Sequence, residues 1–78
     1  MKTIDEYMSL PYRMEITKDE SEGGYVISYP DLPGCLSCGQ NMEETIKNGE
    51  DAKRAWFAAA IEQRLEISEP DQIRRKER

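Results

Sequence analysis

Residues 24–39 constrain the fold of this chain more than any other segment, and they read Gly-Tyr-Val-Ile-Ser-Tyr-Pro-Asp-Leu-Pro-Gly-Cys-Leu-Ser-Cys-Gly. An apolar run ends at Pro30, and Pro30 and Pro33 cannot lie inside a central strand because proline has no N–H to donate to a sheet. Gly34 is free to adopt a positive φ. We therefore predict a strand, a rigid corner and a second strand. The corner has a distinctive shape and no catalytic side chain, which favours binding over chemistry.

Alternation and turn residues predict the remaining strands. Residues 12–17 alternate apolar and polar side chains, which is typical of a half-buried strand. The polar stretch 18–24 ends in two glycines and predicts the loop of a hairpin. The second strand covers residues 25–29, and a short third strand covers residues 36–39. A final short edge strand is predicted over residues 67–70.

A short helical turn is predicted within residues 3–10, and a long helix begins after Asn41. Asn41 caps the first free N–H groups, and Glu44 reaches back to the start of the helix. The apolar stripe expected to face the sheet consists of Met42, Ile46, Gly49, Ala52, Trp56, Ala59 and Ala60. A glycine in mid-helix costs about 1 kcal/mol relative to alanine, so we expect the helix to approach the sheet closely at Gly49.

A second, narrower stripe on the same helix holds Phe57, Ile61 and Leu65. One sheet face cannot cover both stripes. The part of the helix around Phe57 is therefore expected to meet another chain or the N-terminal turn. Trp56, on the first stripe, is expected to belong to the core.

Length and charge limit the possible functions. With 78 residues the chain forms one domain, assigned to residues 1–70, and residues 71–78 are a charged tail or a truncated linker. So small a core is marginal, which favours self-association. The net charge is −5 without histidine. This charge disfavours nucleic-acid binding over the whole surface and suits a basic partner.

Hydropathy and cysteine content predict the compartment. The sequence has no apolar run of about 18 residues, so we expect no membrane span. It also lacks the pattern of a secretory signal, and two cysteines without such a signal fit a reducing cytoplasm.

The sequence offers few groups for catalysis or cofactor binding. Cys35 and Cys38 form a C-x-x-C pair, but a structural zinc site needs four ligands and a redox pair usually lies at a helix N-terminus. The two thiols are therefore interpreted as ordinary strand residues on opposite faces. The carboxylates considered for a metal site are Asp31, Glu43, Glu44, Glu50 and Asp51. Capping, turn and solvent roles account for them, so we predict no catalytic residue, metal or cofactor.

The complete pattern resembles the HicB antitoxin family over roughly residues 11–70. The residues that carry the resemblance are Gly23-Gly24-Tyr25-Val26, Tyr29-Pro30-Asp31-Leu32-Pro33-Gly34-Cys35, Gly39, Glu43-Glu44, Ala52, Trp56 and Ile67-Ser68-Glu69-Pro70. The resemblance implies an α+β fold, a partial ribonuclease-H-like β-β-β-α-β unit. In such a unit an antiparallel sheet of three to four strands is packed by one long helix. It also implies a partner, a small HicA-type toxin that cleaves mRNA and is neutralised when its active surface is covered.

Many members of this family also carry a C-terminal DNA-binding module that represses their operon. Only eight residues follow Pro70 in this sequence, so DNA binding is expected only if the full gene encodes such a module. Two alternatives stay open, an operator-binding autoregulator and a metal-dependent nuclease.

The predicted partner surface combines charge with apolar contact. Asp19, Glu20, Glu22 and Asp31 are expected to meet the basic toxin, together with Tyr25, Tyr29, Leu32, Phe57 and Ile61. A homodimer or a higher oligomer is expected, built on an exposed sheet edge or on the second helix stripe.

Overall fold

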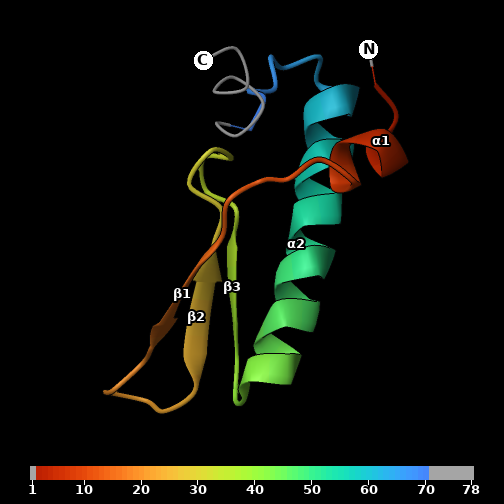
Figure 1. The fold of residues 1–78 in the computed structure, drawn as a ribbon. Coiled ribbons are helices and arrows are strands. Elements are labelled where there is room, and N and C mark those ends of the chain that lie inside the picture. The colour runs from red at the N-terminus through yellow and green to blue at the C-terminus, as the bar shows by residue number, and fades with distance from the viewer. Residues whose placement is uncertain (1, 71–78) are drawn as a thin grey trace, which may run out of the picture.

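Three short strands and two helices are present in residues 2–70, the part of the chain described by this computed structural model. In chain order the elements are α1 (Ile4–Met8), β1 (Glu15–Lys18), β2 (Tyr25–Ser28), β3 (Leu36–Gly39) and α2 (Met42–Glu62). Figure 1 shows α2 running along the sheet, with α1 beside its C-terminal half. The predicted α+β class is confirmed.

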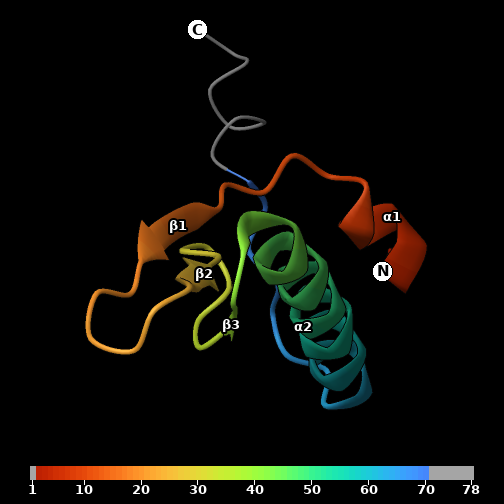
Figure 2. The same cartoon turned by 90° about the horizontal axis from the view of Figure 1, so that it is seen from below.

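The strands form one antiparallel sheet in the order β1-β2-β3. Ile27 of β2 lies opposite Ile16 of β1 and Ser37 of β3. Because side chains alternate along a strand, these three share the face toward α2, where Ile27 is completely buried. Figure 2 shows β3 nearest to α2 and β1 farthest from it. β1 is therefore one free edge of the sheet among the described residues.

The predicted corner between β2 and β3 is confirmed. The Tyr29 N–H donates to the Cys35 carbonyl at 3.0 Å and closes the loop. Within it, the Leu32 N–H donates to the Tyr29 carbonyl at 2.9 Å, and the Cys35 N–H donates to the Leu32 carbonyl at 3.0 Å. Gly34 has φ +79°, the left-handed conformation that glycine adopts without strain. These turns direct the Leu32 side chain into the core, where it is 1% exposed.

The predicted cap of α2 is also present. The Glu44 N–H donates to the Asn41 side chain at 2.7 Å. The Glu44 carboxylate accepts from the Gln40 N–H at 2.9 Å, one residue before the position that a capping box would use. Two backbone N–H groups at the start of the helix, those of Gln40 and Glu44, therefore have side-chain hydrogen-bond partners.

The predicted helix face is wrong in part. The buried residues of α2 are Thr45, Gly49, Lys53, Phe57 and Ala60, whereas Met42 is 44% exposed and Ala59 is exposed. The reason is α1, which covers α2 from a second side, with the Tyr7 ring stacked on Phe57 at a centroid distance of 5.0 Å. The expectation that the helix around Phe57 meets the N-terminal turn is therefore confirmed, and Phe57 belongs to the core.

The predicted close approach at Gly49 is confirmed. A Cβ atom at this position would lie 2.8 Å from Cδ1 and 2.9 Å from Cγ2 of Ile27. Both distances are too short for carbon atoms in contact. Because Gly49 has no side chain, α2 can pack this closely against β2.

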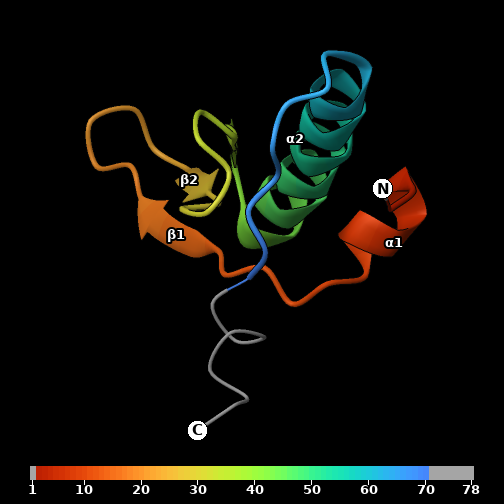
Figure 3. The same cartoon turned by 90° about the horizontal axis from the view of Figure 1, so that it is seen from above.

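The predicted strand over residues 67–70 is wrong, because these residues join no ladder with β1, β2 or β3. Side chains anchor the segment instead. The Tyr12 hydroxyl donates to the Ser68 carbonyl, Ile67 packs on the core, and Pro70 is buried. Figure 3 shows the segment returning past α2 to the coil between α1 and β1. The tail predicted for residues 71–78 lies outside the described residues.

Gly49→Leu tests the helix–sheet contact. The added side chain would overlap Ile27, so we expect the free energy of unfolding to fall by about 1–3 kcal/mol even though leucine favours helix. Urea denaturation followed by circular dichroism measures the change. Ala58→Leu, on the exposed side of the same helix, is the matched control and should shift stability by less than about 0.5 kcal/mol. Equal effects of the two variants would contradict the contact.

Tyr12→Phe tests the anchor of the final segment. Burial raises the pKa of Tyr12 to about 12 from the ordinary value of 10.0, so the neutral phenol is the form that the fold favours. Its contribution to stability is complete below pH 10 and is lost as the pH rises toward 12. We expect the variant to lose about 1 kcal/mol at pH 7 and to show a shallower alkaline decline.

Urea titrations between pH 7 and 12 measure both effects of Tyr12→Phe. Tyr25→Phe is the control, because Tyr25 lies in the hairpin loop region and takes no part in the hydrogen bond between the Tyr12 hydroxyl and the Ser68 carbonyl. If Tyr12→Phe were as stable as the natural chain at every pH in this range, the Tyr12 hydroxyl could not be what anchors the final segment.

Candidate functional site

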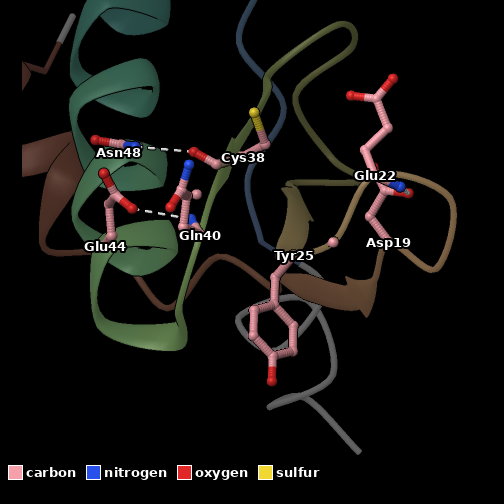
Figure 4. Close-up of a pocket in the computed structure, with 10 residues that line it drawn as sticks. Asp19, Glu22, Tyr25, Cys38, Gln40, Glu44 and Asn48 are labelled. Carbon is pink, nitrogen blue, oxygen red and sulfur yellow. Dashed lines mark hydrogen bonds between the residues drawn. The ribbon is translucent and has the colours of Figure 1, made fainter.

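A groove of about 530 Å³ opens between the β1–β2 loop and the first turns of α2. We call it the hairpin groove. Its lining consists of Asp19, Glu22, Gly23, Gly24, Tyr25, Cys38, Gly39, Gln40, Glu44 and Asn48. In Figure 4 the Tyr25 ring is drawn between the loop residues Asp19 and Glu22 on one side and Gln40 and Glu44, just before and within the first turn of α2, on the other. Three carboxylates and no basic side chain line this hollow, so it favours a cationic ligand.

Close packing between β3 and α2 holds the helix side of the groove in place. A Cβ atom at Gly39 would lie 2.6 Å from the Thr45 nitrogen, so only glycine allows the helix to begin so near the strand. The Asn48 amide donates to the Cys38 carbonyl at 2.8 Å and ties α2 to the edge of β3. Glu44 is held by its bond from the Gln40 N–H. The carboxylate of Glu44 therefore has a defined position.

The hairpin side of the groove is organised by Asp19. Its Oδ1 accepts from the Ser21 N–H at 3.1 Å, from the Ser21 hydroxyl at 3.0 Å and from the Glu22 N–H at 3.3 Å. These bonds, led by the one from the Ser21 hydroxyl, lower the pKa of the Asp19 carboxyl below its ordinary value. Asp19 therefore keeps its negative charge at neutral and mildly acidic pH. Glu20 and Glu22 project from the same loop and are exposed.

The structure brings together four of the residues predicted to contact a partner. Asp19, Glu20, Glu22 and Tyr25 lie in or beside the hairpin loop. Asp31 lies in the β2–β3 corner, which Figure 1 shows at the opposite end of the sheet. One Asp31 oxygen, Oδ2, is buried and has no hydrogen-bond partner within residues 2–70.

The other predicted contact residues lie in or against the core. Tyr29 is 3% exposed, Leu32 1% and Phe57 0%. Ile61 is half-buried and packs against the same core cluster. In this conformation the first three present no side chain to another protein. Their assignment to a partner surface stays a prediction.

A second hollow, of about 410 Å³, lies between the corner and the end of α2. We call it the corner groove. It is lined by Pro33, Trp56, Ala59, Ala60, Leu65, Glu66 and Ser68. The Trp56 Nε1–H donates to the Pro33 carbonyl at 2.9 Å, and its ring meets Phe57 edge-on at 5.7 Å. Trp56 thus belongs to the core on one side and forms the wall of a groove on the other.

The two cysteines occupy different environments. Cys35 is buried and Cys38 is exposed, and both are free thiols. Burial raises the pKa of the Cys35 thiol, and the nearby Lys53 ammonium opposes that shift. Lys53 is itself mostly buried, with its Nζ 5.1 Å from the centre of the Tyr29 ring, a cation–π contact. These contacts make Cys35 and Lys53 part of the packing between the corner and α2.

Within residues 2–70 no group of three or more His, Cys, Asp or Glu side chains is arranged to hold a metal ion. No helix in the same range combines the length and the apolar character needed to cross a membrane.

Sequence reasoning missed the contribution of α2 to the hairpin groove. The sequence pattern predicts only a capping role for Glu44, and it predicts no role for Asn48. The available signal was Gly39, two residues before the helix cap Asn41, which lets the first turns of α2 lie close to β3 and the hairpin. Capping and groove formation are compatible, because Glu44 uses one oxygen for the Gln40 N–H.

The fold and the hairpin groove define a small α+β module with an acidic surface suited to a basic partner. Comparison with known families identifies it further. A family model described as the HicB-like antitoxin of bacterial toxin–antitoxin systems matches residues 12–78. The chain belongs to this family of antitoxins.

Individual relatives agree with the family assignment. "Antitoxin HicB 2" of Photorhabdus laumondii subsp. laumondii is 32% identical over 63 residues, which cover 81% of this chain and 45% of the relative. A UPF0150 protein of Thermoplasma acidophilum is 43% identical over 48 residues, 62% of this chain and 68% of that protein. An uncharacterized 14.9 kDa protein of Haemophilus phage HP1 is 34% identical over 50 residues, 64% of this chain and 38% of the relative. The chain thus spans less than half the length of the Photorhabdus and phage relatives.

Proposed function

We propose that this chain binds a small, basic HicA-type toxin and neutralises it by covering the surface that the toxin uses to bind and cleave mRNA. The observation that carries the proposal is the hairpin groove, an acidic surface on a member of an antitoxin family. The chain acts by occlusion, without catalysis, in the cytoplasm where mRNA is translated.

The physical basis of the proposed inhibition is competition for positive charge. A ribonuclease that grips RNA needs Lys and Arg side chains for the phosphates. Asp19, Glu20 and Glu22 present carboxylates from one loop, and Glu44 adds another from the start of α2. Carboxylates opposite the phosphate-binding side chains steer the encounter and exclude RNA from the same site. The phenol of Tyr25, half-buried in the groove, supplies aromatic contact at the centre of this surface.

The proposed surface leaves out Tyr29, Leu32 and Phe57. Contact through these side chains would require opening the core, because all three are almost completely buried. Their part in binding is indirect, since they hold the corner and α2 in the positions that shape the molecule. Asp31 and Ile61 lie away from the hairpin groove and are secondary candidates for contact.

The most direct experiment uses the product of the neighbouring gene. The two proteins are co-expressed, the complex is captured through a tag on one of them, and cleavage of RNA by the toxin is measured with and without this chain. We expect a stable complex in which cleavage stops at stoichiometric amounts of antitoxin. Failure to bind, or cleavage of RNA by the purified chain alone in the presence of Mg²⁺, would contradict the proposal. A specific shift of operator DNA by the chain alone would instead favour the autoregulator.

Charge reversal in the hairpin loop tests the electrostatic part of the proposal. The variant Glu20→Lys/Glu22→Lys leaves Asp19 intact, because Asp19 holds the turn through its own hydrogen bonds. We expect association with the toxin at low ionic strength to slow by about tenfold and to depend less on salt. Stopped-flow fluorescence at several salt concentrations measures both changes.

The control for this variant is Glu62→Lys/Glu66→Lys, which changes the net charge equally at exposed positions at the end of α2. This control should associate faster than the loop variant at the same salt concentration. If the two variants slow association equally, the hairpin loop has no special role and only the net charge matters.

A further inference from the structure

Two side-chain hydrogen bonds join the first turns of α2 to the chain at the end of β3. The Asn48 Nδ2 donates to the Cys38 carbonyl at 2.8 Å, and the Gln40 N–H donates to the Glu44 carboxylate at 2.9 Å. Figure 4 shows both bonds crossing between the helix and the neighbouring chain. We call them the paired bonds.

The spacing of the paired bonds matches the geometry of the two segments that they join. Four residues of an α-helix rise by about 6 Å, and two residues of a strand rise by about 6.6 Å. Glu44 and Asn48 are four residues apart on one face of α2, and their partners Cys38 and Gln40 are two residues apart along the chain. Because the two spacings agree, both bonds form at once in a single register of helix against strand.

The hairpin is held at the same place by close contact between backbones. A Cβ atom at Gly24 would overlap the Gly39 carbonyl oxygen, and a Cβ atom at Gly39 would lie 2.7 Å from the Thr45 hydroxyl oxygen. Thr45 is completely buried at this contact. The end of the hairpin, the end of β3 and the first turn of α2 therefore touch one another. This contact fixes the separation between the two walls of the hairpin groove.

We propose that Asn48 is a positioning residue for toxin binding and acts on the partner surface through Glu44. The Asn48 bond keeps the Gln40 N–H within reach of the Glu44 carboxylate, and that N–H holds the carboxylate on the wall of the hairpin groove. The inference rests on the proposed function and deepens it. It assigns the geometry of an acidic surface to an uncharged side chain.

The physical basis of this role is the cost of ordering a long side chain. Glu44 is exposed, and an exposed glutamate exchanges among several rotamers that binding must restrict. The bond from the Gln40 N–H imposes that restriction before the toxin arrives. A cation of the toxin then meets a carboxylate that is already in place. Loss of this order should appear mainly as faster dissociation of the complex.

A double-mutant cycle tests whether Asn48 acts through Glu44. Asn48→Ala removes one of the paired bonds and favours the helix, whereas Glu44→Gln keeps an oxygen acceptor and removes the charge. We expect Asn48→Ala to raise the dissociation constant of the complex with the toxin by about tenfold, chiefly through the dissociation rate. In the Glu44→Gln background the same change should raise the constant by less than about twofold, because the two residues act as a unit. Surface plasmon resonance measures both rate constants.

Gln63→Ala is the matched control for the cycle. It deletes an exposed amide near the other end of α2 and leaves the net charge unchanged, so the dissociation constant should stay within about twofold. Two results would overturn the positioning role. One is an Asn48→Ala chain that binds the toxin as tightly as the natural chain, and the other is an equal effect of Asn48→Ala in both backgrounds.

Amide exchange in the chain without toxin tests the same role independently of binding. In Asn48→Ala we expect the Gln40 N–H to exchange with water at least about threefold faster, because Glu44 then accepts from it for less of the time. The Asp19 N–H, which donates to the Gly24 carbonyl in the hairpin, is the internal reference and should keep its rate. NMR measures both rates.

The two measurements together separate failure of this inference from failure of the proposed function. An unchanged Gln40 exchange rate in a chain that binds the toxin would overturn the positioning role alone. A faster Gln40 rate in a chain whose natural form binds no toxin would overturn the proposed function, and the role of Asn48 in toxin binding with it.

Discussion

The approach of α2 to the sheet at Gly49 determines where the rest of the structure can lie. Ile27 fills the space that a side chain at Gly49 would occupy, so α2 packs directly against this residue of β2. From that contact the helix extends in both directions. Its first turns reach the hairpin and complete the acidic groove, and its later turns carry Phe57 under Tyr7 and Trp56 against the corner.

As a result, one end of the sheet stabilises the fold and the other end carries the candidate binding surface. At one end the corner turns Leu32 inward and receives the Trp56 hydrogen bond, so that prolines, glycine and tryptophan serve stability. At the other end the hairpin loop exposes carboxylates whose geometry depends on Asp19 and on the cap of α2. The segment that is most distinctive in the sequence is therefore the scaffold, and the less distinctive polar loop carries the candidate site.

Local patterns predicted much of the fold. Prolines and Gly34 located the corner and Asn41 located the start of α2, because each of these signals acts within a few residues. Alternation predicted the first strand over residues 12–17, whereas β1 covers Glu15–Lys18. The buried face of α2 was wrong because helical periodicity gives the apolar positions and not the number of elements that cover them. α1 covers Phe57 from a second side. The strand at 67–70 was wrong because Tyr12 and Pro70 anchor that segment through side chains. Of the hairpin groove, only the loop residues were predicted. Glu44 comes near them through tertiary structure, which a local pattern does not reveal.

Membership of the HicB-like antitoxin family and an acidic groove lead to one central claim, that this chain and RNA compete for the same basic surface of a toxin. The measurement that tests it most directly uses a catalytically inactive toxin loaded with fluorescent RNA and titrated with the antitoxin. The account predicts that RNA anisotropy falls to the value of free RNA at one antitoxin domain per toxin. A ternary complex in which the RNA stays bound while the antitoxin binds would contradict it.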